Sequence, residues 1–472
     1  MSYTLSTVQV PTPLLHVIQL FTATFDTIDQ LPDARKLEAT VHQDFKVIQR
    51  QSMEACVQHK AQEAIAKDVR ETRCPHCADG WAVLLEPAAP RYAETVRGRV
   101  DYARPIYRCD QSDCRRERSL FDEELGLDPK EHYTPLLQDK LAWAGTSGSS
   151  FERASRDLEH QNEISVGAAQ IRRVTEKAGR RVLELQDEEV KRRGAPASLE
   201  APIPTAEQPE TVVIEMDGTC AMGRDGTGHE VKCATVFGLD ARATTGSPGK
   251  ERPVLLRRCY CATSRGIRPF GAMVWALASW WGVRSARRVA VIGDGIDWIW
   301  NYSRDRLHFT LTDGRVVKPV EIVDFYHAAE NLGKARDAIF ADNESATAVA
   351  WFERWRHRLR QGEIDAVIAE LDKRAKAAKD EERRDALRVR KAYFAGHRER
   401  MRYLEFEALG LPIGSGAIEG TCKNLIKGRM DGVGMRWDVE EGIELMTALR
   451  VRMFNERWED LWKDDQDHAK AA

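Results

Sequence analysis

The sequence predicts an α/β core that is interrupted by a helical insertion and preceded by a helical region and two small modules. Three observations lead to this prediction. Apolar runs of strand length follow one another after residue 210, helical periodicity dominates after residue 327, and two cysteine pairs enclose an extended segment before residue 120. A chain of 472 residues is long enough for two to four domains with separate cores.

The composition narrows the class of protein. Hydrophobic residues make up 42% and charged residues 31%, which is typical of an ordinary soluble globular protein. Apolar windows stay below the roughly 18 residues that a membrane helix needs, and the first 15 residues lack the features of a secretory signal. We therefore expect an intracellular protein without a membrane partner. Ten cysteines are too sparse for a disulfide scaffold and are expected to be thiols or metal ligands.

The first module is predicted from its cysteines. Two residues stand between Cys74 and Cys77, four stand between Cys109 and Cys114, and a strand-like segment separates the pairs. Four thiolates at this spacing can close a tetrahedral structural zinc site, and a metal would supply the folding energy that so short a segment lacks. The alternatives are four unrelated free cysteines, or His76 in place of one of them. We predict a zinc ribbon without a catalytic role, because four protein ligands leave no open position on the ion.

The second module is predicted to be a helix-turn-helix. A helix, a polar break near Asn162 and a second helix that begins at Ser165, with this serine as its N-cap, precede a proline-rich linker. Two helices around a turn are also common in all-α proteins that bind nothing. The second helix nevertheless carries residue types that reach phosphates and base edges in a DNA major groove. These candidate DNA contacts are Gln170, Arg172, Arg173 and Lys177.

Beyond the linker, the apolar period changes from that of a helix to that of a strand. Three runs predict an antiparallel meander, and a helix and a buried strand follow. A further hairpin is expected, with Asp313 and Gly314 at its turn. This order is that of an RNase H-like core. The segments are TVVIEMDGTCAM (211–222), VKCATVFGL (231–239), PVLLRRCYCAT (253–263), PFGAMVWALASWWGV (269–283), RRVAVIGDGI (287–296) and LHFTLTDGRVVKPVEIVDF (307–325).

Two of these strands end on an acid. Asp217 precedes Gly218, and Asp294 precedes Gly295. A strand holds its terminal carboxylate rigidly, and the glycine allows close approach of a substrate or metal. If the strands are neighbours, both carboxylates lie at one sheet edge, where two Mg²⁺ or Mn²⁺ ions for phosphoryl transfer could be held. Each Asp-Gly pair alone is more often a simple turn.

A third acid is predicted on a late helix. Glu419 follows Ser415, a possible helix cap, and Lys423 and Lys427 lie one and two turns further along the same face. An acid followed by lysines suits a helix that holds a metal while its neighbours grip DNA phosphates. Taken alone, Glu419 would be read as a solvated helix residue.

Two further acids and a histidine lie nearby in the sequence. Asp324 and His327 stand where a strand meets a helix, and the histidine could orient a phosphate or an attacking water, although a satisfied half-buried histidine is about as common. Asp297 is a rival to Asp294, but its position suggests a charge in the first turn of the next helix.

The late helical block is basic. Residues 354–402 hold 16 Lys/Arg and 9 Asp/Glu residues. This excess suits contact with DNA phosphates, and a solvated helical face rich in ion pairs is an equally good interpretation.

At residues 211–456 the chain resembles the Kra group of bacterial insertion-sequence transposases, which use an Asp-Asp-Glu triad. The resemblance rests on IGDGIDWIW, IVDFYHAAENL, GSGAIEGTCKNLIKGRM and the closing GMRW, and the Asp-x-x-His element also resembles that of Mutator-type transposases. It implies an RNase H-like fold, a triad of Asp217, Asp294 and Glu419, and an accessory element of Asp324 and His327. Arg436 in GMRW is a further candidate DNA contact.

The resemblance implies an enzyme of the bacterial cytoplasm that associates with the nucleoid, with double-stranded DNA as partner and with homodimers or larger assemblies on DNA. Two other functions remain open from the residues: a structure-specific nuclease or resolvase on the same fold, and a domesticated regulator that binds DNA without catalysis. The predicted regions are 1–70 (helical), 71–125 (zinc ribbon), 126–193 (helix-turn-helix), 194–210 (linker), 211–334 (first part of the core), 335–405 (helical insertion) and 406–472 (Glu helix and C-terminal helices).

Overall fold

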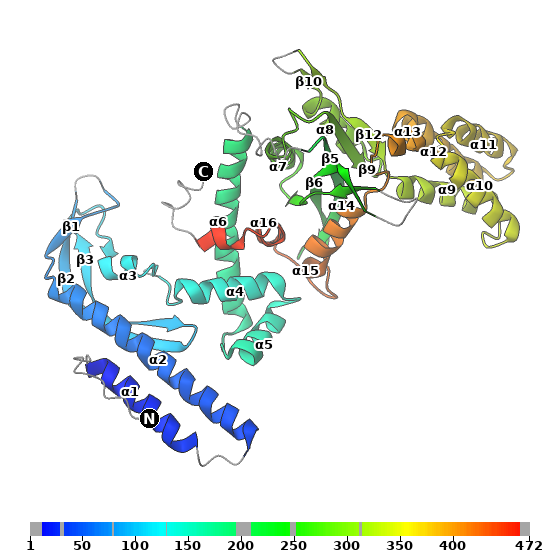
Figure 1. Ribbon diagram of the computed structural model, residues 1–472. Helices are drawn as coiled ribbons and strands as arrows, with labels where there is room; N and C mark the ends of the chain where they lie inside the picture. The colour runs from blue at the N-terminus through cyan, green and yellow to red at the C-terminus, as the bar shows by residue number, and fades with distance from the viewer. Residues whose placement is uncertain are drawn as a thin grey trace. The chain divides into compact units, whose positions relative to one another are not determined.

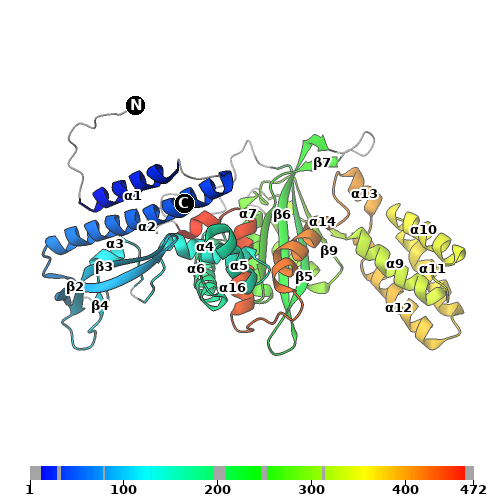
Figure 2. The same ribbon diagram turned by 90° about the horizontal axis from the view of Figure 1, so that it is seen from below.

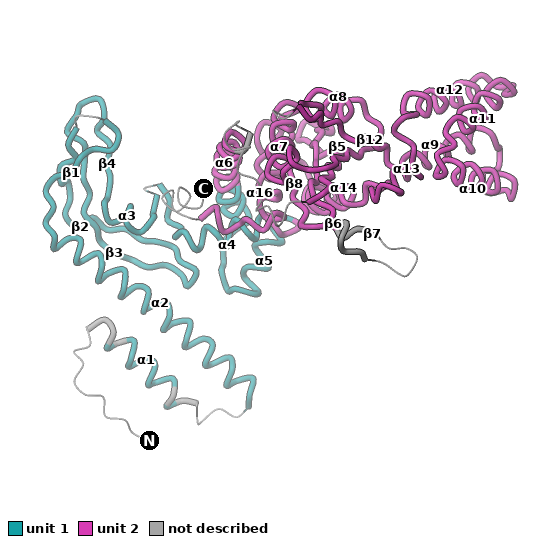
Figure 3. Tube along the Cα trace, turned by 45° about the horizontal axis from the view of Figure 1, so that its top comes forward, with its two compact units in different colours: residues 1–145, 150–175 teal, residues 146–149, 176–472 magenta. Residues whose placement is uncertain are grey.

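The computed structural model of the chain has a mixed α/β organisation, as predicted, and divides into two compact units (Figure 3). Unit 1 comprises Met1–Gly145 and Ser150–Thr175, and unit 2 comprises Thr146–Ser149 and Glu176–Ala472. In the described part of the chain, no helix has the length and apolar character needed to cross a lipid bilayer. The structure describes residues 12–28, 33–77, 80–128, 130–194, 209–245, 252–310 and 314–462.

Unit 1 begins with two helices followed by an antiparallel sheet of strand order β1-β2-β3-β4. The long helix α2 packs along β3 (Figure 1), and a small core forms between them around Ala61, Tyr102 and Phe121. The elements are α1 (Thr12–Ile28), α2 (Ala34–Ala66), β1 (Glu71–Arg73), β2 (Trp81–Thr95), β3 (Gly98–Cys109), β4 (Glu117–Arg118) and α3 (Leu120–Glu124).

Three helices follow, α4 (Pro135–Ser147), α5 (Phe151–Asn162) and α6 (Ala168–Gly194). The predicted helix–break–helix pattern is present in α5 and α6, but the predicted cap at Ser165 is wrong. Helix α6 starts three residues later, and the carbonyl of Gly167 accepts its first hydrogen bonds. The hydroxyl of Ser155 binds the Val166 carbonyl at 2.7 Å, which holds the turn outside the helix. The predicted linker falls almost entirely outside the described residues.

Unit 2 is built on a six-stranded sheet of order β12-β9-β5-β6-β7, with β8 also paired to β6. The predicted meander is present, but its third run divides into two strands, β7 and β8. Strands β9 and β12 run parallel to β5, and every other pairing is antiparallel. The strands are β5 (Thr211–Met222), β6 (Gly228–Thr245), β7 (Arg252–Leu255), β8 (Cys259–Thr263), β9 (Arg288–Gly293) and β12 (Val320–Val323).

The apolar runs that predicted these strands form one large core with the helices around them. Helix α7 (Ile267–Trp280) packs on β6 and β8, and α8 (Asp297–Arg306) follows β9. The extra hairpin is present as β10 (Phe309–Thr310) paired with β11 (Val316–Val317). Of its predicted turn, Gly314 has a φ of 81°, and Asp313 lies outside the described residues.

The helical block forms a bundle beside the β12 edge of the sheet (Figures 1 and 2). Many of its basic residues pair with acids of the same block, for example Arg374 with Glu370 at 2.8 Å and Lys391 with Asp372 at 2.6 Å. Ion pairing therefore accounts for part of the basic excess. The helices are α9 (Phe325–Ile339), α10 (Ala346–Arg360), α11 (Ile364–Ala377), α12 (Glu381–Gly396), η3 (Arg398–Arg400) and α13 (Tyr403–Ala408).

The chain then returns to the sheet. Its last elements are α14 (Gly416–Thr421), the π-helical segment η4 (Cys422–Lys427), α15 (Gly428–Met430), α16 (Gly442–Phe454) and η5 (Trp458–Trp462).

Candidate active site

Three aspartates lie in one row across the parallel strands. Extending the β5–β9 register by two residues puts Asp217 opposite Asp294, and extending the β9–β12 register by one residue puts Asp324 opposite Asp294. The backbone N–H of Asp324 continues this ladder, donating to the carbonyl of Gly293 at 2.8 Å. Adjacent strands are about 4.8 Å apart. The three acids therefore lie at neighbouring backbone positions, just beyond the carboxyl end of the parallel pairing, and we call this place the acidic edge.

Asp217 lies inside β5, which continues to Met222, so the prediction that this strand ends on the acid is wrong. The side chain is half-buried, and its two oxygens have different partners. One accepts from the backbone N–H of Gly218 at 2.7 Å, and the other from the Cys422 thiol at 3.7 Å. Burial raises the pKa of Asp217, the Gly218 N–H opposes this change, and the nearby charge of Asp294 raises the pKa further. A cation placed between the two carboxylates would relieve both effects.

Asp294 stands on a tight turn that the helical block touches. Its side chain accepts from the backbone N–H of Ile296 at 3.0 Å, and the hydroxyl of Tyr393 on α12 donates to its carbonyl at 3.2 Å. Gly295 has a φ of 106°, and a Cβ there would lie 3.0 Å from the Tyr393 ring. Both the backbone conformation and the close approach therefore require glycine.

Glu419 is exposed on α14. Hydrogen bonds to buried side chains of β5 and β6 hold this short helix against the sheet. The backbone N–H of Ile418 donates to the Glu215 carboxyl at 2.8 Å, and the hydroxyls of Thr235 and Thr421 lie 2.8 Å apart. Sequence reasoning missed Glu215. Its signal was a charged residue inside an apolar strand, on the same side as Asp217 two residues later.

Asp324 is completely buried, and backbone groups occupy its oxygens. One oxygen accepts from the N–H groups of Tyr326 at 2.5 Å and His327 at 3.0 Å, and the other accepts from the N–H of Ser415. The carboxylate thus caps α9 and holds the segment that leads into α14. Although burial opposes ionisation, its bonds to His327 and Ser415 lower the pKa of Asp324.

The His327 ring lies beside this carboxylate. Its Nδ1 is 3.6 Å from the Asp324 Oδ1 atom, which is an ion-pair distance and too long for a hydrogen bond. The interaction with Asp324 outweighs burial and raises the pKa of His327 to about 9. The imidazole is therefore protonated at neutral pH, when it can donate to a phosphate oxygen.

One group of potential metal ligands lies at this edge. Asp324, His327 and Glu419 each offer a ligand atom within 4.8 Å of the others. Within the described ranges, Asp217 and Asp294 do not join such a group, so the predicted triad is not a closed set of ligands. The two residues that form this group with Glu419 are those of the predicted accessory element.

Lys423 and Lys427 are exposed on the segment after Glu419, as their predicted role requires. That segment is π-helical, a geometry that frequently occurs at functional sites. The buried guanidinium of Arg450 satisfies two of its carbonyls, donating to Leu425 at 2.9 Å and also to Asn424. Burial lowers the pKa of Arg450 to about 10.

Arg436 is exposed on a loop that is pinned to the β5–β6 hairpin. The N–H of Trp437 donates to the Met222 carbonyl and the N–H of Arg224 donates to the Trp437 carbonyl, both at 2.9 Å. Among the residues that the structure describes, the Arg436 side chain donates to the carbonyl of its neighbour Met435 at 2.7 Å. The backbone next to the exposed Arg436 is thus fixed to the β5–β6 hairpin.

The four candidates on α6 differ in their surroundings. Gln170 and Arg173 are exposed, whereas Arg172 and Lys177 are half-buried. Arg173 is engaged by the Glu131 carboxylate at 2.5 Å and by the Gln170 side chain at 3.1 Å. DNA contact by Arg173 would therefore compete with an existing ion pair.

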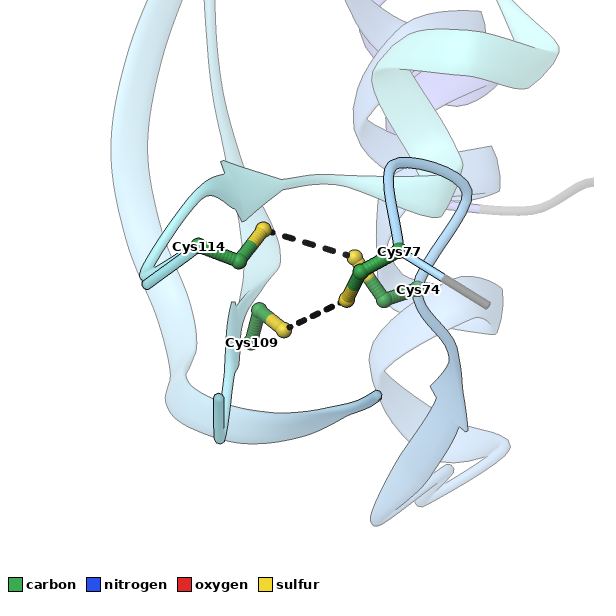
Figure 4. A group of neighbouring side chains, drawn as sticks. All are labelled: Cys74, Cys77, Cys109 and Cys114. Atoms are coloured by element: carbon green, nitrogen blue, oxygen red, sulfur yellow. Dashed lines mark hydrogen bonds between the residues drawn. The ribbon is translucent and has the colours of Figure 1, made fainter. Parts of the chain in front are cut away.

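The four predicted cysteine ligands converge in unit 1 (Figure 4). Their sulfurs lie within 4.8 Å of one another, with Cys74 to Cys114 at 3.8 Å and Cys77 to Cys109 at 3.4 Å. A zinc tetrahedron with Zn–S bonds of about 2.3 Å has sulfur–sulfur edges of about 3.8 Å, so the cluster can bind zinc.

The backbone near the four cysteines supports this site. A hydrogen bond from the backbone N–H of His76 lowers the pKa of Cys74 to about 7, towards the thiolate that a metal needs. At Gly80 a Cβ would lie 2.4 Å from the Cys77 sulfur, so no side chain fits there. His76 is not part of the ligand group, in agreement with the four-cysteine prediction.

No family model matches the chain, and no curated protein matches it. Among solved structures, it has a distant similarity to the Drosophila P element transposase strand transfer complex, at 10% sequence identity and a TM-score of 0.25. The match covers 70% of this chain and 81% of that chain. At this level of similarity, the function has to be argued from the chain's own residues.

Proposed function

We propose that this protein is an RNase H-like DNA transposase that cleaves the ends of an insertion sequence and joins them to target DNA. The observation that carries the proposal is the placement of Asp217, within β5, beside Asp294, which directly follows the adjacent parallel strand β9, with Glu419 on a helix fixed to β5. An antiparallel meander followed by two parallel strands on the other side of β5 is also the strand arrangement of an RNase H-like core.

The residues at this edge have separate roles in the proposed reaction. Asp217 would contact both metal ions, Asp294 and Glu419 would each complete one site, and His327 would hold a phosphate oxygen by its ring proton. Two bound Mg²⁺ or Mn²⁺ ions activate an attacking oxygen and stabilise a leaving oxygen in such reactions. The carboxylate oxygens of these residues are the donors that hard divalent cations prefer.

DNA would be held by cations around this edge and by the N-terminal modules. Lys423, Lys427 and Arg436 are exposed and would neutralise phosphates. The ribbon, with its structural Zn²⁺, and the helix-turn-helix would recognise the element ends. Because two ends must react together, we expect a homodimer or larger assembly on DNA.

The test is strand transfer by the purified protein, with its flanking DNA ends, a target plasmid and Mg²⁺. Asp294→Ala is expected to abolish joined products, whereas Asp297→Ala, which removes the neighbouring exposed acid, is expected to retain them. Cleavage without joining would replace the proposal with a nuclease or resolvase. Tight DNA binding without chemistry under any metal would favour a regulator.

A further inference from the structure

The helix that carries Glu419 has no cap of its own. The first N–H groups of any helix lack partners inside the helix and need acceptors from elsewhere. Ser415 occupies the N-cap position of α14, but its side chain makes no capping hydrogen bond. The acceptors must therefore come from other elements.

Two buried carboxyl groups supply them. Asp324, at the end of β12, accepts from the N–H of Ser415, and Glu215, on β5, accepts from the N–H of Ile418 at 2.8 Å. Asp324 is 0% exposed and Glu215 is 2% exposed, so neither side chain is free to move. Their strands lie on the two sides of β9, which ends at Gly293, directly before Asp294. The start of α14 is thereby bound to the end of β12 on one side of β9 and to β5 on the other side.

We propose that Glu215, together with Asp324, is a positioning residue that sets the location of Glu419 relative to Asp217 and Asp294. The inference rests on the proposed function in one respect, since it takes Glu419 to be a metal ligand. Glu215 touches neither metal nor DNA in this role and acts only through the backbone of α14.

The chemistry of the position supports a positioning role. A buried carboxyl is costly, and an apolar side chain among the neighbouring valine, isoleucine and methionine residues of β5 would fill the space without that cost. An apolar residue would leave the Ile418 N–H buried without an acceptor. Groups that orient metal ligands typically change metal affinity by 10–100-fold when they are removed.

The test uses the full-length protein with Glu215→Gln and Glu215→Leu. Glutamine keeps a carbonyl oxygen for the Ile418 N–H, so it should leave the Mn²⁺ concentration for half-maximal DNA cleavage within about threefold of wild type. Leucine removes the acceptor and should raise that concentration tenfold or more, with the KM for DNA unchanged. Glu215→Met serves the same purpose if the leucine variant does not fold.

The matched control is Glu444→Leu. Glu444 is also a buried carboxylate that accepts from the Ser264 N–H at 2.6 Å and the Thr263 hydroxyl at 2.7 Å, and it pairs with Arg265 at 3.1 Å. None of these partners belongs to α14. Its loss should lower the melting temperature without changing the Mn²⁺ requirement. An equal change in the Mn²⁺ requirement in this control would show general destabilisation and overturn the inference.

Two other outcomes also overturn it: a wild-type Mn²⁺ requirement in the leucine variant, or an equal defect in the glutamine variant. A second readout separates this inference from the proposed function. Bound Fe²⁺ reduces added hydrogen peroxide to hydroxide and a hydroxyl radical and becomes Fe³⁺, and the radical cuts nearby backbone. We expect such cuts beside Asp217 and Glu419 in the protein without DNA. One outcome is that the wild-type protein shows these cuts and the Glu215→Leu variant loses those at Glu419, while neither protein processes DNA. In that case the positioning role stands and the transposase proposal fails.

Discussion

The Asp324 carboxylate binds three backbone N–H groups, two at the start of α9 and one before α14. The sequence suggested a catalytic accessory residue, because its spacing to His327 matched a known element. The spacing could not show that the oxygens would already be occupied. One of the two oxygens accepts from the N–H of Ser415, a residue that is distant from Asp324 in the sequence and reaches it only in the folded chain.

The Asp324→Asn variant tests these hydrogen bonds to the Asp324 carboxylate. Its amide group can accept on one side only, so either the Ser415 N–H or the α9 N–H groups lose their acceptor inside the core. We expect a loss of about 1–3 kcal/mol in the free energy of unfolding, measured by urea denaturation. Asp380→Asn is the control, because Asp380 caps α12 at an exposed site and asparagine caps equally well there. Equal losses in both variants would contradict the assignment.

The ion pair of His327 predicts a dependence of stability on pH. Its pKa is raised to about 9 in the folded protein, mainly by Asp324, above the ordinary value of 6.5. The stabilisation is therefore complete below pH ~6.5 and is lost as the pH rises through ~9. Wild type and His327→Gln should differ most in free energy of unfolding at pH 6 and converge near pH 10. A difference that grows with pH would contradict the pairing with Asp324.

At the scale of elements, apolar periodicity was sufficient for the strands of the main sheet, because each run alternates or is buried throughout. It was insufficient for the start of α6 and for the π-helical turn after α14. Both depend on single tertiary contacts, the Ser155 hydroxyl in one case and the Arg450 guanidinium in the other. The pattern of apolar and polar residues around each segment does not indicate such contacts.

The four-cysteine cluster gives a prediction at this scale. We expect about one zinc per chain by elemental analysis, as a tetrahedral Cys₄ site implies. Gly80→Ala should lower the zinc content, because its Cβ would lie 2.4 Å from the Cys77 sulfur. Gly167→Ala is the control, since no atom lies within 4 Å of a Cβ at that position. Full zinc occupancy in Gly80→Ala would contradict the proposed geometry of the site.

At the scale of the whole molecule, the order of strands and helices could be predicted from the sequence, and with it the edge at which the acids gather. The register that aligns Asp217, Asp294 and Asp324 could not, because a strand pattern fixes which face a residue occupies and not its level along a neighbouring strand. The division of the chain into two compact units was likewise not evident from the sequence, which suggested seven regions.

DNA binding by the full chain should depend steeply on salt. Each phosphate contact contributes about one unit to the slope of log K against log salt concentration. The double variant Lys423→Ala/Lys427→Ala should reduce the slope by about two units, measured by fluorescence anisotropy with duplex DNA. Lys379→Ala, which removes an exposed lysine of the helical block, serves as the comparison. An unchanged slope in the double variant would remove these lysines from the DNA interface.

The contact between Tyr393 and the Asp294–Gly295 turn has a consequence for protein engineering. The tyrosine belongs to a block of helices that, on a linear map, looks like an optional inserted module. Because the Tyr393 hydroxyl binds the Asp294 carbonyl and its ring packs against the Gly295 backbone, the helical block supports the turn that carries the Asp294 carboxylate. The block and the sheet would therefore have to be exchanged together. Minimised enzymes made by excising the block, or chimeras that combine it with a foreign sheet, would need to retain this pair.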